Sequence, residues 1–344
     1  MTAAKEVGSL EEIRGLLKAL PPADEEAGQI AERRQAQLTK PAGSLGRLED
    51  LAVWLATWQG RNPPSVERPY AAVFAGNHGI ASKGVSAYPA EVTVQMVQNF
   101  IEGGAAVNQL CSLANADLRV YEMALEEPTG DISEGPAMTE ADCVRAMAYG
   151  MMAVESGIDV LALGEMGIGN TTAAAALCCG LFGGTAGDWV GPGTGIDAAR
   201  LADKVALVDQ AVALHRDALD DPLQVLCRLG GRELAAIAGA VLAARLARTP
   251  VVLDGYASTA AAAVLYALDP ASLDHCVVSH MSAEPGHKRL LARLGKRPLL
   301  DLGMRLGEAS GAMVAMLLLK AAAACHNGMA TFDEAGVSGP GDDA

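Results

Sequence analysis

Aromatic residues are scarce in this sequence: they make up 4% of its 344 residues, whereas alanine and glycine are abundant. This composition favours tight packing of helices on a sheet over a pocket lined with aromatic rings. Positive charge is also in short supply, because 26 Lys and Arg residues stand against 41 Asp and Glu residues. The formal net charge of −15 argues against nucleic acid as a partner. An anionic ligand would therefore need backbone amides and a few selected cations.

Several features that would indicate other classes of protein are missing. No CxxC pair is present, and the seven cysteines lie mostly within apolar patterns, which indicates reduced thiols in a cytoplasmic protein. No apolar run is long enough to cross a membrane, and the charged N-terminus lacks the apolar segment of a signal peptide. His280, Glu284 and His287 have metal-ligating side chains, but Pro285-Gly286 argues against a helix that would place them together. We therefore expect no metal site.

Short apolar runs of strand length alternate with helical patterns along most of the chain. This alternation implies right-handed crossovers and an α/β fold, in which helices cover both faces of a mostly parallel sheet. The expected strands are 70–75, 118–123, 159–163, 251–253 and 275–278. The expected helices are 9–20, 24–38, 48–58, 91–100, 140–155, 173–181, 201–219, 232–247 and 312–325.

The segment from Gly164 to Thr172 joins one of these strands to an Ala-rich helix. Its glycines permit a sharp turn, and Asn170 or Thr171 is expected to be the N-cap of the helix. Free amides and the positive end of a helix dipole make a phosphate site, but Glu165 would repel an anion. A carboxylate at this position would be favourable if it faced an electropositive ligand or accepted a proton. A plain strand-to-helix turn with a solvated Glu fits the same spacing.

Polar side chains also follow three other expected strands. The carboxyl ends of parallel strands meet at one edge of a sheet, which is where ligands bind. The sequence therefore predicts a single site formed by Glu165 together with Asn77, His78, Asp254, Ser282 and Glu284.

Three charged residues each admit two interpretations that their spacing does not separate. Asp254 could hold a ribose hydroxyl, or it could form a turn before Gly255. Lys204, near the start of an expected helix, could reach a phosphate or be solvated. Glu308 precedes an apolar helix, where it could accept a proton with a raised pKa or simply favour the helix dipole.

Five segments carry a resemblance to a known family: 38–48, 84–89, 164–172, 282–287 and 305–308. Over residues 26–338 the chain resembles the nicotinate-nucleotide–dimethylbenzimidazole phosphoribosyltransferases of cobalamin synthesis. The resemblance implies that the 5-phosphoribosyl group of nicotinate mononucleotide moves to 5,6-dimethylbenzimidazole. The products would be α-ribazole 5′-phosphate and nicotinate, with inversion at the anomeric carbon. No cofactor is expected.

The resemblance also implies roles for individual residues. Glu308 would accept the proton, and Glu165 would be a second functional carboxylate. Many family members have Asp where this chain has Asn77, so we interpret Asn77 as a hydrogen-bonding or structural residue. The expected contacts to phosphate, ribose and nicotinate are Gly167, Asn170, Thr171, Lys204, Asp254, Gly255 and Ser282, and those to the base are Ser86, Tyr88 and Gln95.

The family resemblance further implies a homodimer with a small helical domain built from both chain termini. We accordingly expect residues 1–62 and 305–344 to form that domain and residues 63–304 to form a Rossmann-like α/β domain. Neither nucleic acid nor a membrane is expected as a partner. Two alternatives stay open: another glycosyl or phosphoribosyl transferase with the same phosphate site, and a non-catalytic nucleotide-binding protein of the same fold.

Overall fold

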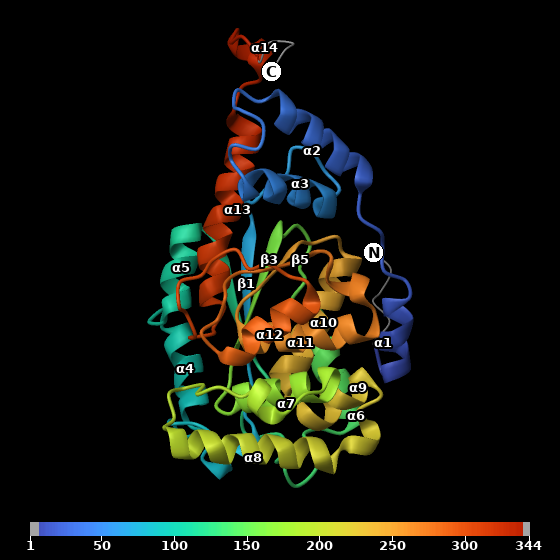
Figure 1. The fold of residues 1–344 in the computed structure, drawn as a ribbon, viewed down its shortest axis with the longest axis vertical. Helices are drawn as coiled ribbons and strands as arrows, with labels where there is room; N and C mark the ends of the chain where they lie inside the picture. Colours follow the sequence, from blue (N-terminus) through green and yellow to red (C-terminus); the bar gives the residue numbers. More distant parts are fainter. Residues whose placement is uncertain (1–6, 340–344) are drawn as a thin grey trace.

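A five-stranded, wholly parallel sheet forms the centre of the molecule in the computed structural model, which describes residues 7–339 (Figure 1). Residues 1–6 and 340–344 of the two expected terminal segments lie outside the described residues. The strand order is β2-β1-β3-β4-β5, and every neighbouring pair is parallel. The α/β fold expected from the sequence is confirmed. The strands are β1 (Pro69–Ala75), β2 (Asp117–Glu122), β3 (Val160–Met166), β4 (Val251–Leu253) and β5 (Cys276–Val278).

Alternate residues of the strands enter two separate cores, one on each face of the sheet. Leu161 and Leu163 of β3 pack into the core that includes the helices after β2, β3 and β4, whereas Val160 and Ala162 pack into the opposite core. This burial on both faces explains why the strands are continuous apolar runs. The first core contains α6 (Glu140–Met151), α7 (Asn170–Phe182), α9 (Pro222–Leu229), α10 (Arg232–Leu246) and α11 (Tyr256–Leu268); the second contains α5 (Ala106–Ala114) and α13 (Ser310–Gly328).

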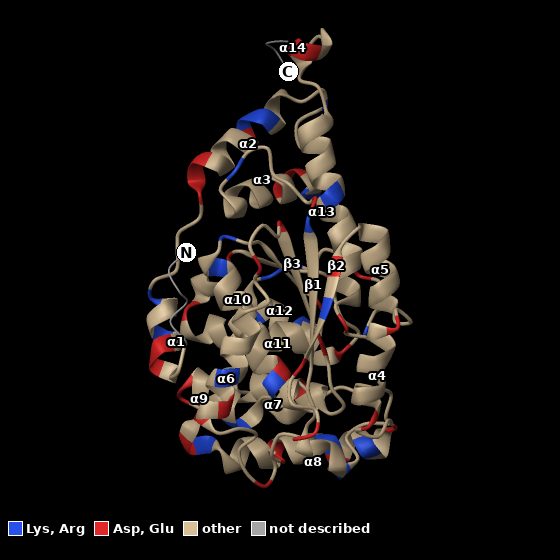
Figure 2. Cartoon of the chain, turned by 180° about the vertical axis from the view of Figure 1, so that it is seen from behind, with Lys and Arg blue, Asp and Glu red and all other residues tan. Residues whose placement is uncertain are grey.

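The helices nearest the sheet are rich in alanine and poor in charge. Neither α7 nor α11 has a charged residue, and both are largely buried. Figure 2 shows that the charged residues instead gather on outer elements such as α1, α2 and α8 (Ala198–Leu214). Small side chains let the inner helices approach one another and the sheet closely. Within residues 7–339, no helix combines the length and hydropathy needed to span a membrane.

Five helices were not predicted from the sequence: α5, α9, α11, α12 (Pro285–Leu294) and α14 (Phe332–Ala335). The expectation that Pro285-Gly286 prevents a helix here is wrong. Glu284 is the N-cap of α12 and Pro285 is its first residue, a position where the missing N–H costs no hydrogen bond. The remaining helix beside the sheet, α4 (Val92–Ile101), agrees closely with the predicted range.

Segments from both ends of the chain pack together at one end of the molecule (Figure 1). They are α2 (Glu25–Gln37), α3 (Arg47–Gln59), the last turns of α13 and the segment leading into α14 (Phe332–Ala335). Arg34 donates hydrogen bonds to the carbonyl oxygens of His326 and Met329. By contrast, α1 (Leu10–Leu17) packs against α6 in the main core, so it does not join this cluster. That the cluster forms a separate domain stays a prediction.

Candidate functional site

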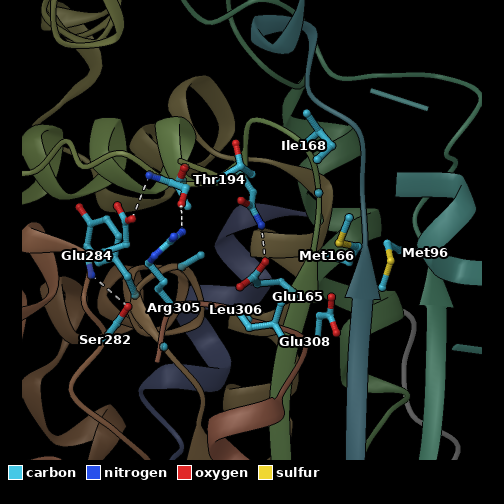
Figure 3. Close-up of a pocket in the computed structure, with 18 of the residues that line it drawn as sticks. Met96, Glu165, Met166, Ile168, Thr194, Ser282, Glu284, Arg305, Leu306 and Glu308 are labelled. Atoms are coloured by element: carbon cyan, nitrogen blue, oxygen red, sulfur yellow. Dashed lines mark hydrogen bonds between the residues drawn. The ribbon is translucent and has the colours of Figure 1, made fainter. Parts of the chain in front are cut away.

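A cavity of about 500 Å³ lies beyond the carboxyl ends of β3, β4 and β5 (Figure 3). Its walls are the segments that follow these strands, one face of α4, the loop around Gly193 and the turn that precedes α13. The volume is typical of a site for small molecules. The predicted site residues that line it are Tyr88, Glu165, Gly167, Asn170, Thr171, Gly255, Ser282, Glu284 and Glu308.

Two predicted base contacts do not line the cavity. The buried Ser86 hydroxyl is hydrogen-bonded to the hydroxyl of Thr194 at 2.9 Å. Gln95 is exposed on α4. The residues of α4 that do line the cavity are Val92 and Met96, which are four positions apart and therefore share a helix face. That spacing is visible in the sequence and could have identified Met96.

Lys204 and Asp254 lie one layer behind the cavity wall. Lys204 Nζ donates to Thr171 Oγ1 and to the Gly191 carbonyl, both at 3.0 Å, so the solvated interpretation of this lysine is wrong. Burial lowers the pKa of Lys204 to about 8. Asp254 is completely buried and its Oδ1 accepts the Ala312 amide at 2.8 Å, so it caps the N-terminus of α13. Neither residue touches the cavity directly.

The structure does not bring Asn77 and His78 to the predicted site. Asn77 Nδ2 donates to the Leu125 carbonyl at 2.8 Å, which confirms its interpretation as a hydrogen-bonding residue. His78 Nε2 lies 2.7 Å from Glu233 Oε1, and both side chains are buried. This pair packs beneath Gly76 and Gly169, where an added Cβ would meet Glu233 and His78 respectively. The two residues therefore support the strand ends from below.

Glu165 and Glu308 lie together at one end of the cavity, beside Met96 and Met166 (Figure 3). Burial raises the pKa of Glu165 well above its usual range, and the negative charges of Asp254 and other carboxylates add to this. Burial also raises the pKa of Glu308, to about 7. The Glu308 carboxyl can therefore exist with or without a proton near neutral pH.

The turn that carries Glu308 has an unusual backbone. Gly307, Glu308 and Ala309 have φ angles of 84°, 63° and 60°, and a left-handed conformation costs a residue other than glycine about 1–2 kcal/mol. The Glu308 amide donates to the Glu165 carbonyl at 3.1 Å, which ties the turn to β3. A Cβ on Gly164 would lie 2.0 Å from the Ala309 nitrogen, so only glycine allows this approach. The surrounding contacts thus hold the Glu308 carboxyl at a fixed place.

The start of α7 differs from the sequence-based expectation. Gly169, with φ of 98°, is the N-cap, whereas Asn170 and Thr171 are the first two helical residues. Predicting either of them as the N-cap was therefore wrong. Asn170 instead donates a hydrogen bond from Nδ2 to Glu165 Oε2. This bond fixes the orientation of the Glu165 carboxyl.

The other end of the cavity is polar and suited to an anion (Figure 3). Arg305 Nη1 donates to the Gly193 carbonyl at 2.8 Å, and Glu284 Oε1 accepts the Gly193 amide at 2.9 Å. Ser282 Oγ accepts the Glu284 amide at 3.3 Å, which leaves its hydroxyl proton free to donate to a ligand. The N-terminus of α11, which begins after Gly255, also faces this space. A helix N-terminus, an arginine and a free hydroxyl together favour a phosphate group.

His287 links the two segments of this polar end that contain Ser282 and Gly255. The Ser282 amide donates to His287 Nδ1 at 2.9 Å, so His287 Nε2 carries the ring proton and donates to Thr259 Oγ1 at 3.2 Å. Thr259 in turn donates to the Gly255 carbonyl at 2.7 Å. Burial lowers the pKa of His287 to about 3, so the ring is neutral. Within residues 7–339, no group of three or more His, Cys, Asp or Glu residues is arranged to hold a metal ion.

Comparison with known proteins gives one consistent answer. Residues 20–337 match the model of a family described as phosphoribosyltransferase. The nicotinate-nucleotide–dimethylbenzimidazole phosphoribosyltransferase of Rhizobium meliloti (strain 1021) is 59% identical over 328 residues, which cover 95% of this chain and 97% of the relative. The enzyme of the same name from Brucella anthropi is 57% identical over 329 residues, covering 96% and 97%. The chain belongs to the nicotinate-nucleotide–dimethylbenzimidazole phosphoribosyltransferase family.

A solved structure supports this membership. The crystal structure of a nicotinate-nucleotide–dimethylbenzimidazole phosphoribosyltransferase from Thermus thermophilus matches with a TM-score of 0.84 and 43% identity. The match covers 92% of this chain and 99% of that one. The family resemblance inferred from the five sequence segments is therefore confirmed, and with it the assignment as a phosphoribosyltransferase.

Within this family fold, four polar residues of the cavity were not predicted as ligand contacts: Thr194, Tyr256, His280 and Arg305. Arg305 is the first residue of the Arg-Leu-Gly-Glu segment that carries the resemblance, so its position beside Glu308 was a usable signal. Thr194 lies in a glycine-rich segment whose path the sequence does not indicate. His280 was considered only as a metal ligand.

Proposed function

We propose that this protein transfers the 5-phosphoribosyl group of nicotinate mononucleotide to 5,6-dimethylbenzimidazole. The names of its close relatives support these two substrates. The bond between the anomeric carbon and the pyridine nitrogen breaks, and its electron pair leaves with nicotinate. A benzimidazole nitrogen forms the new bond on the opposite face, which inverts the anomeric carbon and gives α-ribazole 5′-phosphate. The other benzimidazole nitrogen releases its proton.

The observation that carries this proposal is the arrangement of the two ends of the cavity. The phosphate would lie at the polar end, near Ser282, Arg305 and the start of α11. The flat, apolar base would lie between Met96 and Met166, within reach of Glu308. The anomeric carbon would then lie between the two ends, where the donor and acceptor are held for in-line attack.

Glu308 is proposed as the proton acceptor. Its pKa of about 7 suits a general base near neutral pH, and such a base typically contributes ~10²–10⁴-fold to the rate. Glu165 is proposed to stabilise the positive charge that develops on the sugar ring. The departing pyridine becomes neutral, so it needs no metal ion to stabilise it.

The test is to replace Glu308 with glutamine and to follow nicotinate release from nicotinate mononucleotide with 5,6-dimethylbenzimidazole. We expect kcat to fall at least ~100-fold while Kd for the mononucleotide changes little, because the glutamine has the same shape but accepts no proton. The control is Glu126→Gln, which removes the same charge from an exposed position. Wild-type turnover in Glu308→Gln would refute the assignment.

The same assay tests the two alternatives. A wild-type protein that binds nicotinate mononucleotide but releases no nicotinate with any base would be a binding protein. One that turns over faster with purines than with benzimidazoles would be a different transferase. Either result would replace the proposed reaction.

We further propose that the protein is a homodimer of the cytoplasm. Tyr88 and Leu306 are exposed apolar residues that line the cavity, and a partner subunit would cover them. The seven cysteines are free thiols, which fits a reducing compartment. Sedimentation equilibrium of the full-length protein gives the subunit number, and a monomer at micromolar concentration would contradict the dimer.

A further inference from the structure

His280 is a buried histidine in the cavity wall to which the proposed reaction gives no role. It lies two residues after β5, and its side chain is 1% exposed. The ring lines the cavity together with Gly255 and Ser282. A Cβ on Gly255 would approach His280 Cε1 to 3.3 Å and Nε2 to 3.5 Å, so this edge of the ring faces the glycine that borders the cavity.

The hydrogen bonds around His280 decide which ring nitrogen carries the proton. Ser279 Oγ donates its single proton to the Asp254 carbonyl at 2.7 Å. Ser279 can therefore only accept at its second contact, which is His280 Nδ1 at 2.9 Å. Asp254 Oδ1 lies on the same side, 3.9 Å from Nδ1, and also favours a proton there. Burial lowers the pKa of His280, which favours the neutral ring, and a neutral ring protonated at Nδ1 presents a lone pair at Nε2.

That lone pair has no hydrogen-bond partner within residues 7–339. His280 Nε2 is buried and makes no hydrogen bond. The Met304 carbonyl lies near the ring and partly offsets the effect of burial on the pKa of His280. A buried acceptor without a partner costs stability, so its presence in a ligand cavity points to a donor on the ligand.

The chemistry of the proposed substrates leaves few donors to choose from. The nicotinate carboxylate and the phosphate only accept hydrogen bonds at neutral pH. Neither group would therefore donate a hydrogen bond to the Nε2 lone pair. The benzimidazole N–H is assigned to Glu308 at the apolar end. The ribose hydroxyls remain, and they lie between the phosphate and the anomeric carbon, as His280 lies among residues of the polar end.

We propose that His280 Nε2 accepts a hydrogen bond from a ribose hydroxyl of nicotinate mononucleotide and thereby selects a ribosyl over a deoxyribosyl donor. This inference rests on the proposed function. It also reassigns the ribose contact that the family resemblance implied for Asp254. Asp254 instead lies behind His280 and holds α13.

Two substitutions of His280 distinguish the role of Nδ1 from the role of Nε2. In His280→Asn the terminal amide can replace Nδ1 and keep the Ser279 contact, but no acceptor remains at the Nε2 position. In His280→Gln the longer amide can reach the Nε2 position and offer its oxygen to the ligand. The assay compares nicotinate mononucleotide with its 2′-deoxy and 3′-deoxy analogues, by kcat/KM with 5,6-dimethylbenzimidazole and by calorimetric Kd without it.

We expect the wild type to prefer the ribosyl donor over one analogue by about 10- to 100-fold, because the analogue leaves Nε2 unpaired. His280→Asn should reduce this preference to about twofold or less, and His280→Gln should retain part of it. Equal use of all three donors by the wild type would overturn the inference. It would also be overturned if folded His280→Asn preferred the ribosyl donor as strongly as the wild type does.

The proposed function and the His280 contact can fail separately. If the wild type binds the ribosyl donor more tightly than an analogue but releases no nicotinate, the reaction is wrong and the contact stands. If His280→Asn does not fold, long-range ¹H–¹⁵N spectra of the wild type still report the tautomer of each of its six histidines. A proton on His280 Nε2 in the free protein would overturn the inference.

Discussion

Replacing Glu308 with glutamine is expected to stabilise the folded protein at alkaline pH even though it removes the proposed base. The Glu308 side chain is buried, and its pKa is about 7 in the folded protein against 4.5 in model compounds. The folded state therefore binds this proton more tightly than the unfolded chain does. The associated stability is complete below pH about 4.5 and is lost as the pH rises through 7.

The size of the effect follows from the difference between the two pKa values. Ionising Glu308 in the folded protein at pH 8 costs on the order of 3 kcal/mol, because one pKa unit corresponds to 1.36 kcal/mol. Glutamine has the same shape and carries no charge, so Glu308→Gln should gain about that much at pH 8. At pH 5 the gain should shrink to about 1 kcal/mol.

The assay is urea unfolding of the full chain at both pH values, at one fixed protein concentration because a dimer links stability to concentration. Glu126→Gln is the matched control, since it removes a carboxylate from an exposed position and should change stability by less than ~0.5 kcal/mol. Equal unfolding free energies for wild type and Glu308→Gln at pH 8 would refute the reasoning. They would mean that Glu308 ionises without a burial cost.

Three further predictions concern activity. The kcat/KM should fall as the pH drops through about 7, because protonated Glu308 accepts no proton, and a profile of kcat/KM that stays flat from 5.5 to 8.5 would contradict this. Gly164→Ala should lower kcat by ~100-fold, since its Cβ would displace Ala309 and the neighbouring carboxyl; Gly135→Ala, with no atom within 4 Å of its added Cβ, is the control in the same assay. Arg305→Met should raise KM for nicotinate mononucleotide at least ~10-fold in initial-rate measurements, because the phosphate loses a charge-assisted donor; an unchanged KM would place the phosphate elsewhere.

The fold was largely predictable because parallel strands buried on both faces are continuous apolar runs. All five strands were recognised on that basis, including the three-residue β4 and β5. One failure came at a residue type that has two uses. Pro285 was interpreted as a helix breaker but begins α12, because proline fits the first turn of a helix. The sequence alone does not distinguish a proline that stops one helix from a proline that starts the next.

The sequence predicted which loops form the candidate site, but not which of their side chains line the cavity. The common direction of the parallel strands places Glu165, Gly255 and Ser282 at one edge, and the sequence was sufficient for that step. Whether a side chain points into the cavity depends on a few ångströms of loop geometry. Asp254 directly follows β4 and Lys204 lies in α8, yet neither side chain enters the cavity: Lys204 holds Thr171 and Asp254 caps α13.

The same distinction explains why Glu308 could not be assigned from its neighbours in the sequence. The segment before α13 reads as an ordinary helix start, where a glutamate would be solvated and favoured by the dipole. Its burial arises from Gly164, which lies more than a hundred residues earlier and leaves room for Ala309 against β3. The left-handed conformation of Glu308 is acceptable only because that contact and the bond to the Glu165 carbonyl hold it. The raised pKa on which the proposed catalysis depends is therefore a property of the packing between two distant segments, and neither segment carries it alone.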